Sequence, residues 1–371
     1  MDRETCVFTI VSKNYISYAR VFAASFLRYH PGIRVFVLLA DRTEGYFDPG
    51  KESFEVIEAH TLGIKDFESL TFKYNIVEFN TAVKPFFFEY LFSKFGFKKI
   101  IFFDPDILFF KELTEIFGLF ERYSVLLIPH ALSPLPDDGC LPADIDILKA
   151  GCFNLGFIAL SDGLQTDRLL SWWKERVYDK ALQAPLLGYD VDQIWMTLIP
   201  CFFDDYFILK NPGYNIAYWN LHERFITKED GEFLVNNKPI YFFHFSGFRP
   251  DTPGNLSVFQ DRFSLSSSSA IKELFEIYKN LLAKNGYHDT SKWPYSYGFF
   301  KNGSKISAMA RRIYWGLGNY DGFGNPFISF YRKLFNVHNL SLVFKKRFML
   351  AALDAILMHM RNKIYAKSKC L

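Results

Sequence analysis

The stretch TCVFTIVSKNYISYARVFAASFLRYHPGIRVFVLLAD, residues 5–41, decides the fold class. Its first eight residues are β-branched and apolar, which favours a buried strand. Apolar residues at helical spacing follow, and IRVFVLLAD at 33–41 is typical of a second buried strand. A strand, a helix and a strand in this order form a βαβ unit, whose two strands run parallel. We therefore expect an α/β protein.

Similar patterns recur along the chain. They predict strands at 98–103, 124–129, 153–160 and 239–245, and helices at 81–95, 112–121, 165–180 and 190–199. The Pro- and Asp-rich stretch at 133–146 is typical of a surface loop. Serines at 264–269 precede a helical pattern and can cap it, and the composition shifts there. We expect a mixed, mainly parallel sheet flanked by helices in residues 1–255, and a helical region in residues 256–371.

Composition limits the class of protein. Half of the 371 residues are hydrophobic, which indicates a globular chain with a large core. The five cysteines are scattered and form no CxxC pair, so the sequence indicates neither a disulfide framework nor a zinc ribbon. The first residues lack the pattern of a secretory signal, and no uncharged apolar stretch reaches the ~18 residues of a membrane span. We expect a cytoplasmic protein.

Charge is concentrated in the C-terminal tail, residues 341–371. Seven Lys or Arg against one acid, Asp354, give this tail a net charge of +6, which leaves −3 for the other residues. Its helical pattern has a broad apolar face, so we hypothesise contact with the anionic inner face of the plasma membrane. The alternative is a terminal helix that packs on the protein or in a dimer interface. A nucleic-acid partner is not expected, because basic residues do not cluster elsewhere.

Two aspartates interrupt one of the most apolar runs, IIFFDPDILFF at 100–110. An unpaired buried carboxylate is costly, so Asp104 and Asp106 need partners. In α/β sheets ligands gather at the carboxyl ends of strands, and residues two apart in an extended chain point the same way. Both carboxylates can therefore face one hard cation such as Mn²⁺ or Mg²⁺. The alternative is an acidic turn that caps a helix at 111–120.

This stretch resembles the Asp-x-Asp motif of GT-A glycosyltransferases, and the order of motifs around it resembles the retaining enzymes of family 8 in particular. The resemblance covers roughly residues 5–251 and implies a GT-A-like fold. In SKNYISYARVFAAS, Asn14 and Tyr15 match the pair that receives the nucleotide base in that family. A tyrosine ring offers a stacking face and an amide offers hydrogen bonds. Taken alone, a tyrosine at this position is more often a packed aromatic at a helix start.

Two further motifs flank the aspartates. Lys84 in NTAVKPFFFEYLF resembles the family's basic residue that approaches the donor, although Arg is usual there and offers a bidentate fork. The alternative is a surface lysine whose stem lies on apolar neighbours. Asn154 and Gly156 in CFNLGFIAL match the family's Asn-x-Gly strand, in which the amide reaches the sugars and the glycine allows close approach. A neighbouring loop could also satisfy this asparagine.

The last two motifs lie downstream. In LGYDVDQIWMTLI, Asp192 and Gln193 resemble the family's Asp-Gln pair beside the anomeric carbon, and Asp190 is left as a helix cap or a supporting residue. In PIYFFHFSGFRPD, His244 and Gly247 resemble the family's His-x-x-Gly, where the histidine is the third metal ligand and the glycine contacts diphosphate. Arg249 lies one position before the family's phosphate-binding lysine.

The resemblance as a whole implies a metal-dependent glycosyltransferase. Asp104, Asp106 and His244 would bind Mn²⁺ or Mg²⁺, and residues 1–255 would form the catalytic domain for a nucleotide-diphosphate sugar, with UDP expected, and a glycan or lipid-linked acceptor. Retention of configuration is implied, by either a nucleophile such as Asp192 or a front-face attack. KWPYSYGFFKNGSKISAMARRIYW at 292–315 resembles enzymes of bacterial surface-polysaccharide or lipopolysaccharide synthesis. The alternative is a non-catalytic sugar or nucleotide-sugar binding protein with a GT-A fold.

Overall fold

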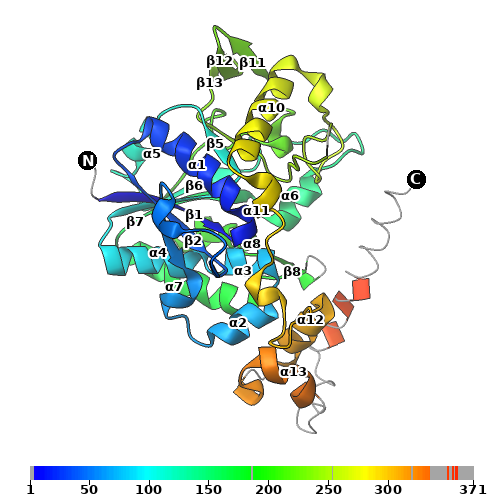
Figure 1. Cartoon of the computed structure of the whole chain (residues 1–371). Helices are drawn as coiled ribbons and strands as arrows, with labels where there is room; N and C mark the ends of the chain where they lie inside the picture. The colour runs from blue at the N-terminus through cyan, green and yellow to red at the C-terminus, as the bar shows by residue number, and fades with distance from the viewer. Residues whose placement is uncertain are drawn as a thin grey trace.

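A seven-stranded sheet forms the centre of the protein (Figure 1). The computed structural model describes residues 4–184, 187–252, 254–318, 321–334, 349–350, 353–354 and 356–357. The strand order is β10-β6-β7-β4-β1-β2-β3, and the bounds are β1 (Thr5–Val11), β2 (Arg34–Leu39), β3 (Glu55–Glu58), β4 (Lys99–Phe103), β6 (Val125–Pro129), β7 (Phe153–Ser161) and β10 (Tyr206–Ile208). Only β7 runs antiparallel to its neighbours, β4 and β6. The predicted mixed, mainly parallel sheet is confirmed.

Helices cover both faces of this sheet, which explains the continuous apolar runs of its strands. All seven residues of β1 are buried. On one face Phe8 of β1 packs edge-on against Phe87 of α4 (Lys84–Tyr90), in a core shared with α3 (Ile76–Ala82) and α7 (Leu164–Lys180). On the other face Val7 shares a core with Phe22 of α1 (Ile16–Tyr29) and Ile116 of α5 (Thr114–Leu119). The flanking helices expected from the sequence are present.

Two predicted helices are divided in the structure. The helix expected at 81–95 is divided between the end of α3 and α4. α3 begins after the capping residue Asn75, and α4 has Pro85 in its first turn. The helix expected at 190–199 becomes α8 (Gln193–Met196) and α9 (Ile199–Phe202). Pro200 lies in the first turn of α9, where a residue that cannot donate a backbone hydrogen bond is tolerated. Residue 190 lies instead in β9 (Tyr189–Asp190), which pairs with β8 (Gln183–Ala184). The expected loop at 133–146 leads into α6 (Asp144–Ala150).

Smaller sheets extend one end of the molecule. β5 (Ile107–Phe109) pairs antiparallel with β14 (Phe242–His244), at the end of the strand expected at 239–245. β11 (Ile226–Glu229), β12 (Glu232–Val235) and β13 (Lys238–Pro239) form a three-stranded sheet next to α10 (Ser269–Lys284) (Figure 1). The predicted serine cap of α10 is confirmed, since Ser268 Oγ accepts a hydrogen bond from the N–H of Ile271.

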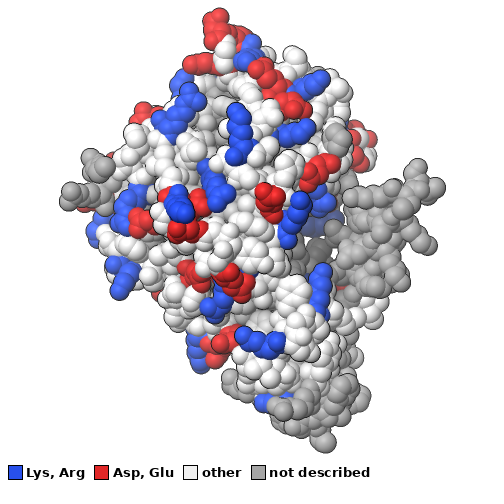
Figure 2. All heavy atoms as spheres, in the orientation of Figure 1, with Lys and Arg blue, Asp and Glu red and all other residues white. Residues whose placement is uncertain are grey.

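The chain returns to the opposite end of the molecule after α11 (Tyr287–Thr290). There α12 (Ala308–Leu317) and α13 (Pro326–Leu334) lie against α2 (Phe67–Lys73) (Figure 1). The division at residue 255 stays a prediction. The basic residues of the C-terminal tail lie outside the described residues, and no helix in the described part has the length and apolar character of a membrane span. On the face in Figure 2, the described basic and acidic side chains are interspersed.

Candidate functional site

The two aspartates lie in the turn between β4 and β5, at the edge where ligands bind in α/β sheets. The N–H of Asp104 donates to Gly156 O of β7 (2.9 Å), which fixes the start of the turn. β14 pairs with β5 so that His244 lies opposite Ile107, and the N–H of Phe245 donates to Asp106 O (2.8 Å). Strand pairing therefore brings the distant imidazole to the aspartates.

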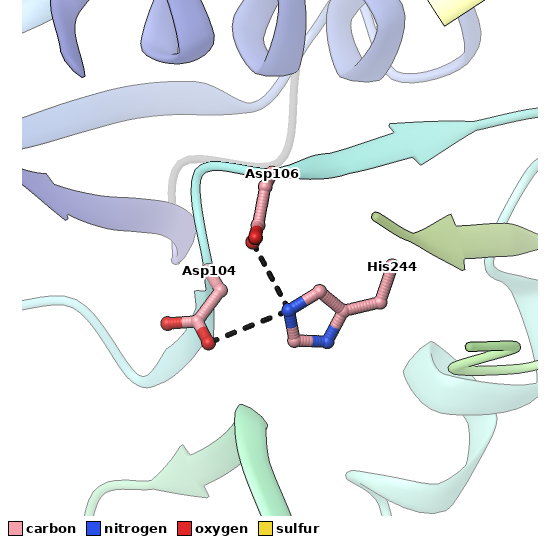
Figure 3. Close-up of side chains that lie close together, drawn as sticks. All are labelled: Asp104, Asp106 and His244. Carbon is pink, nitrogen blue, oxygen red and sulfur yellow. Dashed lines mark ion pairs between the residues drawn. The ribbon is translucent and has the colours of Figure 1, made fainter. Parts of the chain in front are cut away.

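The three side chains point toward one another (Figure 3). His244 Nε2 lies 3.0 Å from Asp106 Oδ1 and 3.7 Å from Asp104 Oδ2, and one ligand atom from each residue falls within 4.8 Å of the others. The imidazole is 3% exposed, whereas the carboxylates of Asp104 and Asp106 are 35% and 20% exposed. Two carboxylates and an imidazole suit a divalent cation, and the exposed side leaves room for further oxygen ligands.

Charges at this cluster depend strongly on one another. Burial lowers the pKa of His244, but the Asp106 and Asp104 carboxylates outweigh it, so the pKa is raised above its ordinary value. Burial raises the pKa of Asp104 to about 6, although Lys84 and His244 act in the opposite direction. Without a cation, a proton on the imidazole compensates the carboxylates, and a divalent ion can replace that proton.

Gly156 makes room for the imidazole. A Cβ at this position would lie 2.4 Å from His244 Cε1 and 2.8 Å from His244 Nδ1. The sequence predicts that Gly156 allows a close approach, and the structure shows that the group approaching it is the His244 ring. This contact explains why a glycine interrupts the buried apolar strand β7.

A buried ion pair lies on the adjoining side of the cluster. Lys84 Nζ is 2.8 Å from Asp192 Oδ2, donates to Leu155 O (3.1 Å) and lies over the Phe102 ring. Lys84 is 2% exposed and Asp192 1%, so the alternative of a surface lysine is wrong. Burial raises the pKa of Asp192 while Lys84 lowers it, and the charges of both residues act on Asp104.

Gln193 and Asn154 contact each other beside this pair. Asn154 Nδ2 donates to Gln193 Oε1 (3.2 Å), which also accepts from the N–H of Leu155 (2.9 Å). Gln193 Nε2 donates to Ala150 O (3.0 Å). The buried Asn154 Oδ1 accepts from Asn215 Nδ2 (3.0 Å), so protein groups satisfy this amide, as the alternative in the sequence allows.

Asp190 does not cap a helix, because it lies in β9 and the N-cap position of α8 is taken by Asp192. Burial raises the pKa of Asp190 to about 6, and the charge of Asp192 adds to the effect. Val191 between them has φ +46°, a left-handed conformation that a β-branched residue rarely adopts. Its N–H donates to Leu182 O (3.0 Å), so the β8–β9 pair holds this strained backbone.

The residues predicted to receive the base lie at the end of β1. Tyr15 is 43% exposed and stacks on Tyr18 at 4.4 Å between ring centroids. The buried Asn14 Oδ1 has no hydrogen-bond partner among the described residues. Burial and the charge of Asp106 raise the pKa of Tyr15, and the charge of Arg249 lowers it. The charges of Asp106 and of the exposed Arg249 therefore both act on Tyr15.

Gly247 requires its glycine for two reasons. Its φ is +71°, and a Cβ would lie 2.5 Å from Ser257 Oγ and 2.6 Å from Phe259 Cδ2. The glycine keeps the chain after β14 close to residues 257–259, and the N–H of Val258 donates to Gly247 O (3.1 Å). This packing accounts for the residue whether or not a diphosphate binds beside it.

Several site residues escaped the sequence analysis. The buried Asn215 and His130 contact the predicted residues directly, and the buried Lys13 lies 2.8 Å from Glu44 and 3.5 Å from Asp41 at the end of β1. Each is a single polar residue without a recognisable spacing to its partners. The sequence contained one indication of such residues: an asparagine or histidine within an apolar stretch is buried, and a buried polar side chain needs a hydrogen-bond partner.

Comparisons with known proteins find relatives that match less than half of this chain. No family model matches the chain. It is 30% identical over 181 residues to YfnF and 25% identical over 175 residues to YfnD, two uncharacterized proteins of Bacillus subtilis strain 168. Both matches cover 46% of this chain, and 57% and 54% of the relatives, so the chain spans about half the length of the curated relatives it matches.

Similar solved structures include glycosyltransferases. A galactosyltransferase, LgtC, in complex with donor and acceptor sugar analogs has 16% identity and a TM-score of 0.42, over 75% of this chain and 95% of that one. GlyE of Streptococcus pneumoniae TIGR4 has 14% identity and a TM-score of 0.43, over 80% and 67%. Mouse xyloside xylosyltransferase 1 has 13% identity and a TM-score of 0.40, over 65% and 97%. Likenesses this distant do not assign a function to the site.

Proposed function

We propose that this chain is a metal-dependent glycosyltransferase that uses a nucleotide-diphosphate sugar. The observation that carries the proposal is the convergence of Asp104, Asp106 and His244 beside the buried Lys84–Asp192 pair, in the motif order that the sequence predicts. The three residues would hold Mn²⁺ or Mg²⁺. When bound, this ion supplies positive charge that neutralises a diphosphate leaving group.

In this proposal, other residues of the site bind different parts of the nucleotide-sugar donor. The unpartnered Asn14 Oδ1 supports a hydrogen bond from a nucleobase N–H, and the exposed face of Tyr15 supports stacking. Arg249 and the backbone at Gly247 would contact the phosphates. UDP is the expected nucleotide because an amide and an aromatic ring suit a uracil edge and face.

The hexose would lie between the metal cluster and the Lys84–Asp192 pair. Lys84, Asp192 and Asn154 would position it, and Gln193 would hold β7 beside it through Leu155 and Asn154. Asp192 is paired and 1% exposed, so it would have to leave Lys84 before it could attack the sugar. This supports front-face attack rather than a covalent intermediate for a retaining reaction.

The acceptor in this proposal is a glycan or a lipid-linked saccharide of bacterial surface-polysaccharide or lipopolysaccharide synthesis. The residue patterns at 292–315 motivate that pathway. The rival is a nucleotide-sugar binding protein without turnover, which would share the base and diphosphate contacts but release no free nucleotide.

The test is a panel of nucleotide sugars incubated with the full chain, with and without Mn²⁺, with nucleotide release measured. We expect slow, Mn²⁺-dependent hydrolysis of one donor, and its loss in Asp106→Asn together with loss of Mn²⁺ binding. Asp167→Asn, which changes an exposed acid on α7, is the matched control and should retain both. Tight donor binding without nucleotide release for any acceptor would support the rival, and a chain that binds neither donor nor Mn²⁺ would refute the proposal.

A further inference from the structure

A line of side-chain amides connects the metal cluster with Gln193. His244 Nδ1 lies 3.2 Å from Asn215 Oδ1, and Asn215 Nδ2 donates to Asn154 Oδ1 (3.0 Å). Asn154 Nδ2 in turn donates to Gln193 Oε1 (3.2 Å). We call Asn215, Asn154 and Gln193 the amide relay. Together with His244, the amide relay joins residues from four segments of the chain that no local sequence pattern connects.

The relay fixes the proton on the imidazole. An amide oxygen accepts hydrogen bonds and cannot donate them, so Nδ1 of His244 must carry the hydrogen in the contact with Asn215. In the neutral ring the lone pair is then on Nε2, the atom that faces Asp106 and Asp104. Asn215 therefore selects the tautomer that can coordinate a cation.

The position of Asn215 is itself strongly determined. It is fully buried with φ +52°, a conformation that asparagine tolerates better than most residues. Asn220 Nδ2 donates to Asn215 O (3.0 Å), and the N–H of His244 donates to Ile216 O (2.8 Å). Backbone pairing thus holds the segment of Asn215 along β14, so its amide meets the imidazole in one geometry.

The second half of the relay is equally enclosed. Asn154 Nδ2 also lies 3.2 Å from Nε2 of the buried His130, which accepts the hydrogen because Nδ2 only donates. Each amide therefore has its donor and acceptor sides assigned by its neighbours. Turning the Asn215 amide would place its oxygen against Asn154 Oδ1, acceptor against acceptor, so the contact with Asn154 fixes which side of the amide faces His244.

We propose that Asn215 is a positioning residue that presents His244 Nε2 to a divalent cation and, through Asn154, links the metal cluster to Gln193. The inference rests on the proposed function, because it assumes that Asp104, Asp106 and His244 bind a metal. It adds a residue outside all the recognised motifs and a physical connection between the metal and sugar parts of the site.

Two substitutions separate the two contacts of Asn215. Asn215→Gly suits the positive φ but removes both contacts. Asn215→Asp keeps an oxygen to accept from Nδ1–H and removes the donor to Asn154 Oδ1. Mn²⁺ binding is measured on the full chain without nucleotide, by calorimetry and by the spin-resonance signal of free Mn²⁺. We expect Asn215→Gly to weaken Mn²⁺ binding about 10- to 100-fold and Asn215→Asp to retain it within about threefold.

The donor side of the relay has its own measurement. Asn215→Asp should lower kcat of donor hydrolysis at saturating Mn²⁺, because Asn154 and Gln193 lose their fixed orientation, while the Mn²⁺ affinity is retained. Histidine ¹⁵N spectra provide a signature that stability alone does not move. Recorded without metal at a pH high enough to keep the His244 ring neutral, they should show the Nδ1–H tautomer of His244 in the unsubstituted chain and in Asn215→Asp, and a tautomer mixture in Asn215→Gly.

Controls distinguish this inference from the proposed function. Val177→Ala truncates a core residue of α7 away from the relay, and should lower stability without changing Mn²⁺ affinity. Normal Mn²⁺ binding by Asn215→Gly, with binding lost in His244→Ala, would overturn the role of Asn215 and leave the proposed function intact. If Asn215→Gly does not fold, Asn215→Ser takes its place with the same expected loss. Absence of Mn²⁺ binding in the unsubstituted chain would overturn both.

Discussion

Gly156 is a residue whose side chain is absent because a neighbour needs the space. Gly156→Ala would put a Cβ 2.4 Å from His244 Cε1, far inside van der Waals contact, so the imidazole or β7 must move. We expect Mn²⁺ affinity to fall at least tenfold, because a metal ligand displaced by even 1 Å no longer meets the carboxylates.

Gly118→Ala on α5 is the matched control, since nothing lies within 4 Å of the added Cβ. It should be neutral or stabilising by up to about 1 kcal/mol, as expected for alanine in a helix. Equal Mn²⁺ affinities for the two alanine variants would show that Gly156 does not seat the imidazole.

The lowered pKa of His130 makes the stability of the protein depend on pH. Burial lowers its pKa to about 4, whereas an unfolded histidine titrates near 6.5. Between these values the unfolded chain binds a proton that the folded chain does not, so stability present above about pH 6.5 is lost as the pH falls toward 4. The loss attributable to this residue is on the order of 3 kcal/mol.

His130→Gln removes the titration while its amide oxygen can still accept from Asn154 Nδ2. Urea unfolding at pH 7 and pH 5 should show a smaller loss of stability for this variant than for the unsubstituted chain. Burial also lowers the pKa of His30 to about 4, so part of the loss should remain. An unchanged loss would mean that His130 titrates normally in the folded state.

At the scale of secondary structure, the sequence predicts elements that depend on local periodicity. The buried run at 5–12 and the helical spacing after residue 14 correspond to β1 and α1. The helix expected at 190–199 begins only at Gln193, because tertiary contacts hold Asp190 in a strand and Val191 in a left-handed conformation. Asn215 was not predictable, because its role depends on the pairing of β5 with β14, which places His244 from a distant segment.

The β8–β9 pair, which precedes Asp192, is held by a buried ion pair. Glu78 Oε1 accepts from the N–H of Gln183 (2.8 Å) and from Arg312 Nη2 (2.6 Å), and Arg312 also donates to Gln183 O (3.3 Å). Arg312→Met would leave the buried Glu78 without its cation. We expect a loss of about 3–5 kcal/mol in the free energy of unfolding, measured with urea.

Glu78→Gln combined with Arg312→Met should be more stable than Arg312→Met alone, because no unpaired charge remains on Glu78. The double-mutant cycle isolates this coupling. Strictly additive effects of the two substitutions would contradict an ion pair that braces the β8–β9 pair.

Across the whole molecule, the helices α12 and α13 contribute side chains to the same hydrophobic core as the central sheet. Tyr314 and Phe330 belong to the same buried cluster as Phe8 of β1. Arg311 donates to the carbonyls of Thr71, Phe72 and Tyr74 at the end of α2. The described residues on both sides of residue 255 therefore share one core, and the division there stays a prediction of the sequence.

The C-terminal tail, residues 341–371, is expected to bind anionic membranes. Its net charge of +6 and apolar helical face predict binding to anionic vesicles, with about 1 kcal/mol for each Lys or Arg near the surface. We expect the full chain to sediment with phosphatidylserine-containing liposomes and a chain ending at residue 336 to remain in the supernatant, with added salt weakening the binding of the full chain.

Truncation also removes Asp354, whose carboxylate accepts from Arg312 Nε (2.8 Å). Asp354→Asn in the full chain separates the two effects, because it removes this ion pair and leaves every basic residue of the tail in place. Vesicle binding should then persist, while the free energy of unfolding falls because Arg312 has lost its contact with Asp354. If instead the truncated chain sediments as the full chain does, the tail does not direct the chain to a membrane.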